Sequence, residues 1–351
     1  MDSKNENKKI RVGISIGDIN GIGCEVALKS FSDARMLDFC TPVLFASNKV
    51  VSEQLKTLGL ELRFHGVREA EKVHDGKVNV VNVWKEPVPL EFGQATTNGG
   101  KYAIRSLRAA VDALKKGSID VLVTAPINKN NIQSKDFKFP GHTDYLAQEL
   151  DGESLMFMVT DSVKVGLLTD HIAVKEVASA ITTKLIRDKV FTISKSLTMD
   201  FGIRKPKIAL LGINPHSGDN GTIGKEDEDI MKPAIADLFK EGHLVYGPYS
   251  ADSFFGSQSH QAFDAVLAAY HDQGLIPFKT LSFGQGVNYT AGLAKVRTSP
   301  DHGTAYEIAG KNQADETSFK EAVFTAIKIY RNREDYQWLT KNPLKKQVAK
   351  R

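Results

Sequence analysis

Three histidines, His171, His216 and His271, each follow a short apolar segment that is rich in β-branched residues and ends abruptly in polar side chains. Neutral imidazoles bind borderline divalent cations, and three of them leave coordination positions open for a substrate oxygen, as in a catalytic metal site. The histidines lie too far apart in the sequence for a local metal motif. Each could instead end a strand and hydrogen-bond a loop. The pattern by itself leaves both a metal site and three structural roles open.

Acidic and amide side chains accompany these histidines. Asp170, Asn214 and Asp272 could hydrogen-bond the imidazoles and fix which ring nitrogen faces a metal ion. Asp272 and the more distant Asp252 are also candidates for orienting ligands or accepting protons in catalysis. An Asp that follows a strand more often caps a loop, so a structural role is the alternative.

Two further segments could bind an anion. Lys279, Asn288 and Arg297 lie in a glycine-containing stretch where the backbone can approach a ligand and two cations could hold a phosphate or a carboxylate. His142 and Thr143 follow Pro140 where a helix is expected to begin, and a helix N-terminus attracts anions. The alternative is that Lys279 and Arg297 are ordinary solvated surface residues that bind no ligand.

The glycine-rich segment 17–23 (GDINGIG) is not predicted to bind phosphate. It lacks the glycine spacing of a dinucleotide-binding fingerprint and the Lys of a P-loop, and Asp18 would repel a phosphate. We expect it to form a tight turn between a strand and a helix that starts near Glu25.

The elements that must position these residues are short buried strands and amphipathic helices. Residues 99–116 carry apolar side chains at spacings of three and four and stop at Gly117, which predicts a helix. Strands and helices alternate along the chain, which favours mostly parallel sheets covered by helices, in one or two doubly wound domains. In such sheets ligands bind where strands end, which is where the histidines are. The other predicted helices are 183–201, 226–240 and 317–331, and the predicted strands are 11–17, 43–46, 121–125, 163–169, 207–213 and 265–270.

Composition excludes several other classes of protein. The chain has 351 residues with 41% hydrophobic and 25% charged residues, which is typical of a folded globular protein. Its net charge of +4 comes from the two ends, so the body lacks the basic face of a nucleic-acid binder. Two cysteines make no disulfide framework, and no stretch resembles a membrane span or a signal peptide. We therefore expect a cytoplasmic protein.

Residues 301–312 (DHGTAYEIAGKN) resemble the adenosine-binding loop of isocitrate and isopropylmalate dehydrogenases, which bind a dinucleotide without a Rossmann fingerprint. Six more motifs, in collinear order, resemble the 4-hydroxythreonine-4-phosphate dehydrogenase family over about residues 11–335. The opening motif departs from the family's usual GDPAGIGPE at Ile19, Asn20 and Cys24. The six motifs are GDINGIGCE, TAPINK, GHTDYLA, NPHSGDNG, GPYSADS and YHDQGLIPFK.

This resemblance implies two doubly wound α/β/α domains of the isocitrate dehydrogenase type, with the active site in the cleft between them. We expect one domain to contain residues 1–125 and 285–351 on the cofactor side, and the other to contain residues 126–284. The resemblance also implies a homodimer in which one metal-binding histidine, expected to be His271, comes from the partner subunit.

The resemblance further implies a role for each candidate residue. One divalent ion (zinc, magnesium or cobalt) is expected at His171, His216 and His271, and NAD or NADP at the 301–312 loop. Lys279 is expected either to hold an anion or to transfer a proton. The substrate residues are expected to be His142, Thr143, Lys279, Asn288 and Arg297, the cofactor residues His302, Gly303, Thr304, Ala305 and Asn312, and the catalytic candidates Lys279, Asp252 and Asp272.

The implied reaction is oxidation of the C3 hydroxyl of 4-phosphooxy-L-threonine, with hydride transfer to NAD or NADP. The product, 2-amino-3-oxo-4-phosphooxybutanoate, loses carbon dioxide to give 3-amino-2-oxopropyl phosphate for pyridoxal phosphate synthesis. A near alternative is the same chemistry on D-threonate or D-erythronate 4-phosphate, or on a cyclic dihydrodiol. A second alternative is a module that binds a metal and a phosphorylated metabolite without redox activity.

Overall fold

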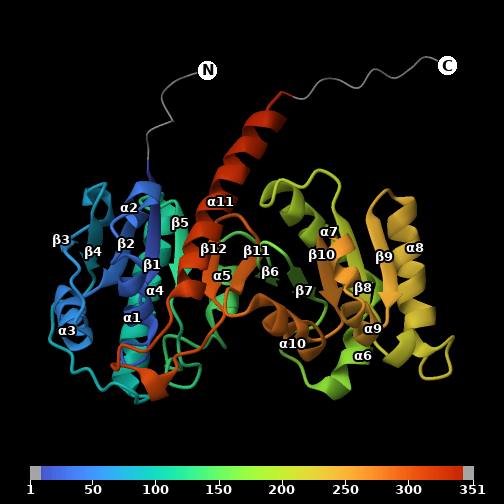
Figure 1. Ribbon diagram of the computed structural model, residues 1–351, viewed down its shortest axis with the longest axis horizontal. Helices are drawn as coiled ribbons and strands as arrows, with labels where there is room; N and C mark the ends of the chain where they lie inside the picture. The colour runs from blue at the N-terminus through green and yellow to red at the C-terminus, as the bar shows by residue number, and fades with distance from the viewer. Residues whose placement is uncertain (1–8, 343–351) are drawn as a thin grey trace.

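A single twelve-stranded sheet runs through the computed structural model, which describes residues 9–342 (Figure 1). The strand order across the sheet is β3-β4-β2-β1-β5-β12-β11-β6-β7-β10-β8-β9. The strands are β1 (Ile10–Ser15), β2 (Cys40–Ala46), β3 (Phe64–Val67), β4 (Val78–Asn82), β5 (Val121–Thr124), β6 (Gly152–Val159), β7 (Lys164–Leu167), β8 (Lys207–Leu211), β9 (Leu244–Tyr249), β10 (Ala265–Ala268), β11 (Val287–Leu293) and β12 (Arg297–Pro300).

Helices cover both faces of this sheet. A turn of π-helix (Asp227–Met231) precedes α8, and short 3-10 turns join other elements. The α-helices are α1 (Gly23–Ser30), α2 (Met36–Phe39), α3 (Asn48–Leu58), α4 (Thr97–Lys116), α5 (His142–Glu149), α6 (Val177–Ala180), α7 (Thr183–Met199), α8 (Lys232–Lys240), α9 (Ala251–Gly256), α10 (His271–Ser282) and α11 (Thr317–Thr340).

The predicted α/β fold is confirmed, and the packing shows why the pattern was informative. Helix α4 begins where the Thr96 hydroxyl accepts a hydrogen bond from the Gly99 N–H, and it ends at Gly117 in the left-handed conformation. Its apolar stripe packs on one face of β1, β2 and β5, while α1 and α11 cover the opposite face. The second half repeats this arrangement, with α7 and α8 on one face and α9 and α10 on the other.

All six predicted strands and all four predicted helices are present, with ends shifted by a few residues. Helix α11 continues to Thr340, beyond the predicted end at residue 331. Its last turns carry no apolar stripe, so periodicity could not reveal them, but they contain no Gly or Pro that would stop a helix. The tight turn expected at residues 17–23 is also confirmed, since Gly17, two residues after the end of β1, has a φ of 68° and α1 begins at Gly23.

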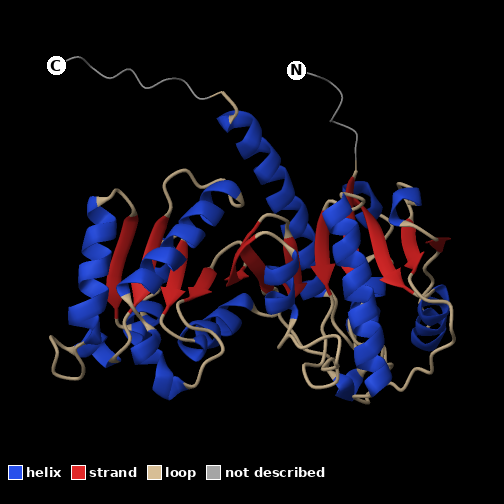
Figure 2. Ribbon diagram, turned by 180° about the vertical axis from the view of Figure 1, so that it is seen from behind, coloured by secondary structure: helices blue, strands red, loops and turns tan. Residues whose placement is uncertain are grey.

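The centre of the sheet is antiparallel, which the sequence did not predict. Strand β11 pairs antiparallel with both β12 and β6, and β6 pairs antiparallel with β7. The outer strands on each side are parallel among themselves. Figure 2 shows the strands of both outer groups pointing toward the same side, where their carboxyl ends lie. The polar residues that follow these strands therefore gather on one side of the molecule.

The remaining expectations about the chain as a whole concern its ends, its cysteines and the membrane. Most of the basic residues at the two ends lie outside the described residues. Cys24 and Cys40 are both free and buried. None of the helices within residues 9–342 has the length and apolarity that crossing a bilayer requires.

A buried carboxylate, Asp18, joins three loops on the side where the strands end. It accepts hydrogen bonds from the Asn20 N–H (2.9 Å), from the Asn131 amide (2.7 Å) and from the Tyr306 hydroxyl (2.7 Å). Its own N–H donates to the Pro126 carbonyl. Asp18 thus fastens the turn after β1 to the loop after β5 and to the loop after β12.

We predict that Asp18→Ala lowers the free energy of unfolding by about 3 kcal/mol, because three donors then lose a buried acceptor. Tyr306→Phe removes only one of these bonds and should cost about 1 kcal/mol. Urea denaturation measures both changes. Equal unfolding midpoints for Asp18→Ala and the unaltered protein would show that Asp18 does not hold the loops.

Candidate active site

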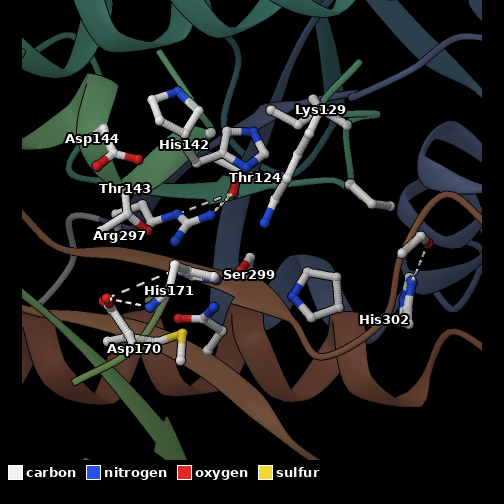
Figure 3. Close-up of a pocket in the computed structure, with 18 residues that line it drawn as sticks. Thr124, Lys129, His142, Thr143, Asp144, Asp170, His171, Arg297, Ser299 and His302 are labelled. Atoms are coloured by element: carbon white, nitrogen blue, oxygen red, sulfur yellow. Dashed lines mark hydrogen bonds and ion pairs between the residues drawn. The ribbon is translucent and has the colours of Figure 1, made fainter. Parts of the chain in front are cut away.

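A cavity of about 600 Å³ lies where the two halves of the sheet meet (Figure 3). Its walls come from distant parts of the sequence: the end of β5 and the loop after it, the start of α5, the loop after β7, strands β11 and β12, and the loop after β12. Four residues predicted from the sequence to bind substrate line this cavity: His142, Thr143, Asn288 and Arg297.

Arg297 is the most unusual of them, because its buried side chain has no carboxylate partner within residues 9–342. It is 2% exposed, and among these residues its guanidinium donates hydrogen bonds only to two hydroxyls, those of Thr124 (2.6 and 3.1 Å) and Thr290 (3.0 Å). Burial lowers the pKa of Arg297 to about 9, so the group is still cationic at neutral pH. A buried cation without a counter-ion is costly, and an anion bound in the cavity would offset that cost.

His142, in the first turn of α5, faces the same cavity. Its Nε2 atom is buried and has no hydrogen-bond partner among the described residues. Burial lowers the pKa of His142 well below its usual value, and the nearby charges of Arg297 and Lys129 lower it further. The imidazole is therefore neutral at pH 7 and can donate or accept a hydrogen bond to a ligand without adding charge.

Asn288 and Ser299 contribute polar groups from the paired strands β11 and β12. The Oδ1 atom of Asn288 is buried and has no partner among the described residues, like Nε2 of His142. Buried polar atoms without partners are rare in folded proteins. Two of them beside one unpaired cation indicate that a polar, anionic molecule completes this cavity.

The loop predicted to bind the cofactor borders the cavity at His302 and Gly303. The His302 Nε2 is buried and has no hydrogen-bond partner within residues 9–342, and burial lowers the pKa of this imidazole. A Cβ added at Gly303 would meet nothing within 4 Å, so the backbone there is open to a planar group. Thr304 is held from behind by a hydrogen bond from the Ile22 N–H to its carbonyl. The other two predicted residues, Ala305 and Asn312, both have positive φ and shape the loop.

The predicted metal ligands are brought only partly together. His171 follows β7 and His271 begins α10, and their ring centroids lie 5.8 Å apart. His216 follows β8 in a turn with a φ of 53°, and its charge helps to lower the pKa of Asp252. Within residues 9–342, no three His, Cys, Asp or Glu side chains are close enough to hold one metal ion. A single chain in this conformation therefore does not supply all three nitrogens to one ion.

The predicted catalytic residues lie outside the cavity walls. Asp272 lies with its Oδ1 2.7 Å from Nδ1 of His271, so it can orient that ring. The pKa of Asp252 is lowered, first by a hydrogen bond from the Ser250 hydroxyl. Lys279 lies with its Nζ 3.3 Å from Oδ1 of Asp301, directly before the cofactor loop.

The sequence analysis missed several polar residues that line the cavity: Thr124, Lys129, Asp144 and Ser299. Thr124 is the first residue of the TAPINK motif and Lys129 is the last. This motif supported the family resemblance, but the sequence analysis assigned no role to either residue. The position of Thr124 at the end of a buried strand was the available signal. Ser299 could not be identified because β12 was not predicted.

The fold and the cavity together define an α/β protein with a polar cavity, lined by a buried arginine, at the junction of its two halves. The chain belongs to the family of the pyridoxal phosphate biosynthetic protein PdxA, whose model matches residues 38–326.

Individual relatives agree with this family over nearly their full length. The chain is 47% identical to a 4-hydroxythreonine-4-phosphate dehydrogenase of Bacteroides thetaiotaomicron, covering 97% of this chain and 94% of the relative. It is 35% identical to a protein of Oceanobacillus iheyensis named as a D-threonate 4-phosphate dehydrogenase, covering 92% and 98%. A crystal structure of 4-hydroxythreonine-4-phosphate dehydrogenase from Klebsiella pneumoniae matches with a TM-score of 0.80 and 30% identity, covering 93% and 99%.

We predict that inorganic phosphate raises the melting temperature of the unaltered protein but not that of Arg297→Met. A ligand that binds only the folded state stabilises it in proportion to RT ln(1 + [L]/Kd), and the substitution removes the buried cation that attracts phosphate. Arg331→Met, at an exposed position on α11, is the matched control and should keep the response. An equal phosphate response in Arg297→Met would contradict an anion site at Arg297.

Proposed function

We propose that this protein is a 4-hydroxythreonine-4-phosphate dehydrogenase of pyridoxal phosphate biosynthesis. It oxidises the C3 hydroxyl of 4-phosphooxy-L-threonine with NAD or NADP, and the resulting β-keto acid decarboxylates to 3-amino-2-oxopropyl phosphate. The observation that carries this proposal is the buried, unpaired guanidinium of Arg297 in a cavity that also borders the 301–312 loop. The family and the named relatives support the same reaction.

The chain's own residues bind and orient the substrate in this proposal. Arg297 binds the phosphate as a bidentate donor, and Thr143 and Asn288 supply further hydrogen bonds. Neutral His142 can donate a hydrogen bond from its ring N–H to a phosphate oxygen without adding a charge. The reacting carbon then extends toward His171 and toward His302 on the cofactor side.

A divalent ion, when bound, would polarise the C3 hydroxyl and the ketone formed from it. His171, His216 and His271 are the residues that would hold it, and Asp272 would orient His271. The separation of His216 from the other two within one chain supports a site completed across a homodimer. Following the family resemblance rather than the distances within one chain, we propose a homodimer in which His271 of one chain joins His171 and His216 of the other.

Lys279 belongs to the cofactor side in this proposal. Its ammonium is close to Asp301, and this pair borders the loop that begins with His302. Burial raises the pKa of Asp301, and the positive charge of Lys279 opposes that rise. The ion pair with Lys279 thus favours the ionised form of this carboxylate beside the loop, and Lys279 remains the nearest candidate for proton transfer on this side.

The two parts of the sheet correspond to the two proposed domains. The strands of residues 1–125 and 285–351 occupy one contiguous half of the sheet, and those of 126–284 occupy the other. We propose that the active site lies in the cleft between these domains. We also propose a cytoplasmic location, since both cysteines are free thiols and the substrate and cofactor are phosphorylated metabolites.

D-threonate 4-phosphate is the second candidate substrate, because a relative of similar coverage bears that name. Arg297 suits either phosphorylated acid and disfavours a neutral dihydrodiol, which carries no anion to pair with a buried cation. A non-redox binding module would need the phosphate site but would have no use for the loop at His302.

We predict that kcat/KM for 4-phosphooxy-L-threonine exceeds that for 4-phospho-D-threonate and 4-phospho-D-erythronate by at least about tenfold, because the site must discriminate the polar group at C2. Formation of reduced nicotinamide, followed by its absorbance, measures all three. A higher kcat/KM for either sugar-acid phosphate would favour the second candidate function. Absence of turnover with every substrate, in the presence of metal, would favour the binding module.

We predict that inactive His171→Ala and His271→Ala proteins regain about a quarter of the unaltered activity when their subunits are exchanged. Random pairing makes half of the dimers mixed, and each mixed dimer has one complete site if His271 comes from the partner subunit. Mixing His171→Ala with His216→Ala is the control, and it should restore nothing. No recovery in the first mixture would rule out the shared metal site.

A further inference from the structure

Lys129 lies in the loop after β5 and is the least explained charged residue of the cavity. It lines the cavity, yet its ammonium makes no hydrogen bond or ion pair with any residue in 9–342. Figure 3 shows its side chain extended toward the space that Arg297 and Ser299 also face. Its Cε lies 3.8 Å from the position of a Cβ at Gly141, so the side chain lies along the start of α5.

Two observations place Lys129 and Arg297 at the same part of the cavity. Both charges lower the pKa of His142, so both act on the imidazole at the start of α5. They are also the only Lys or Arg side chains among the described residues that line the cavity. Two unpaired cations therefore converge near one neutral histidine.

A phosphate monoester carries nearly two negative charges at neutral pH. Arg297 supplies one positive charge, and His142 supplies none because it is neutral. The acidic residues that line the cavity, Asp144 and Asp170, cannot balance an anion. A dianion in this cavity consequently needs the second cation that Lys129 carries.

We propose that Lys129 binds the phosphate of the substrate together with Arg297 and thereby selects a phosphate dianion over a singly charged group. This inference rests on the proposed function for the identity of the phosphorylated substrate. The two cations have different roles in this proposal. Arg297 is held in place by Thr124 and Thr290, whereas Lys129 is exposed and extends on a flexible chain that can close over a bound phosphate.

The test compares Lys129→Met, Lys129→Arg and the control Lys138→Met. Lys138 is exposed on the same loop between β5 and α5 and does not line the cavity, so its replacement removes the same charge from the neighbourhood. Each protein is assayed with 4-phosphooxy-L-threonine and with unphosphorylated 4-hydroxy-L-threonine, and the KM for NAD or NADP is measured separately. The rise in melting temperature with inorganic phosphate gives a readout that needs no turnover.

We expect Lys129→Met to lower kcat/KM for the phosphorylated substrate by about 10- to 100-fold, the range for losing a charge-assisted contact. Its kcat/KM for the unphosphorylated substrate should change less than about threefold, because that molecule lacks the group that Lys129 binds. Lys129→Met should also weaken the phosphate response, Lys129→Arg should restore part of both losses, and Lys138→Met should behave as the unaltered protein.

Equal losses for the phosphorylated and unphosphorylated substrates would overturn the proposal, as would a loss confined to the KM for the nicotinamide cofactor. The phosphate response separates this proposal from the proposed function. If no substrate is turned over but Lys129→Met still loses its phosphate response, the proposed reaction is wrong while the anion role of Lys129 is supported. If that response is unchanged, the role of Lys129 is wrong whatever the reaction.

Discussion

The buried guanidinium of Arg297 is the constraint around which the site is organised. A cation that is enclosed by strands, and that contacts only hydroxyls in the described part of the chain, reduces the stability of the protein when no anion is bound. The surrounding sheet has to be stable enough to bear that cost. Since an anion in the cavity would recover part of it, folding stability and ligand binding are coupled at this one residue. The buried polar atoms of His142 and Asn288 that lack a partner within residues 9–342 add to this coupling, because a bound ligand would supply their hydrogen bonds.

The antiparallel centre of the sheet explains how such a cation can exist. Strands β11 and β12 return late in the sequence and insert between β5 and β6, so Arg297 becomes a neighbour of Thr124 and of the start of α5. A wholly parallel arrangement would need a long crossover at each step. The antiparallel pair instead brings Thr290 and Arg297 together within a few residues. The cavity is thus a consequence of the strand order at the junction.

Local patterns in the sequence predicted what depends on local physics. Periodicity and the Gly117 stop predicted α4, and apolar runs ending in polar residues predicted the strands that precede His171, His216 and His271. Strand β12 is too short to show a pattern and carries a buried Arg, which periodicity assigns to the surface. The role of Lys129 could not be predicted either, because an exposed Lys in a loop has no local signature. It becomes notable only once the fold shows that it lacks a partner beside Arg297.

The loops around the cavity are tied to one another more firmly than to any single strand. Asp18 bonds to Asn131, two residues after Lys129, and to Tyr306, four residues after His302. A shift of the loop that carries Lys129 would therefore strain the loop that borders the proposed cofactor site. A shift of the second loop would strain the first in the same way. Buried hydrogen bonds of this kind resist independent movement, because each loop that moves alone leaves a donor unpaired. Asp18 consequently holds the proposed phosphate end and the proposed cofactor end of the cavity in fixed relative positions, which is the geometry that hydride transfer between two bound molecules requires.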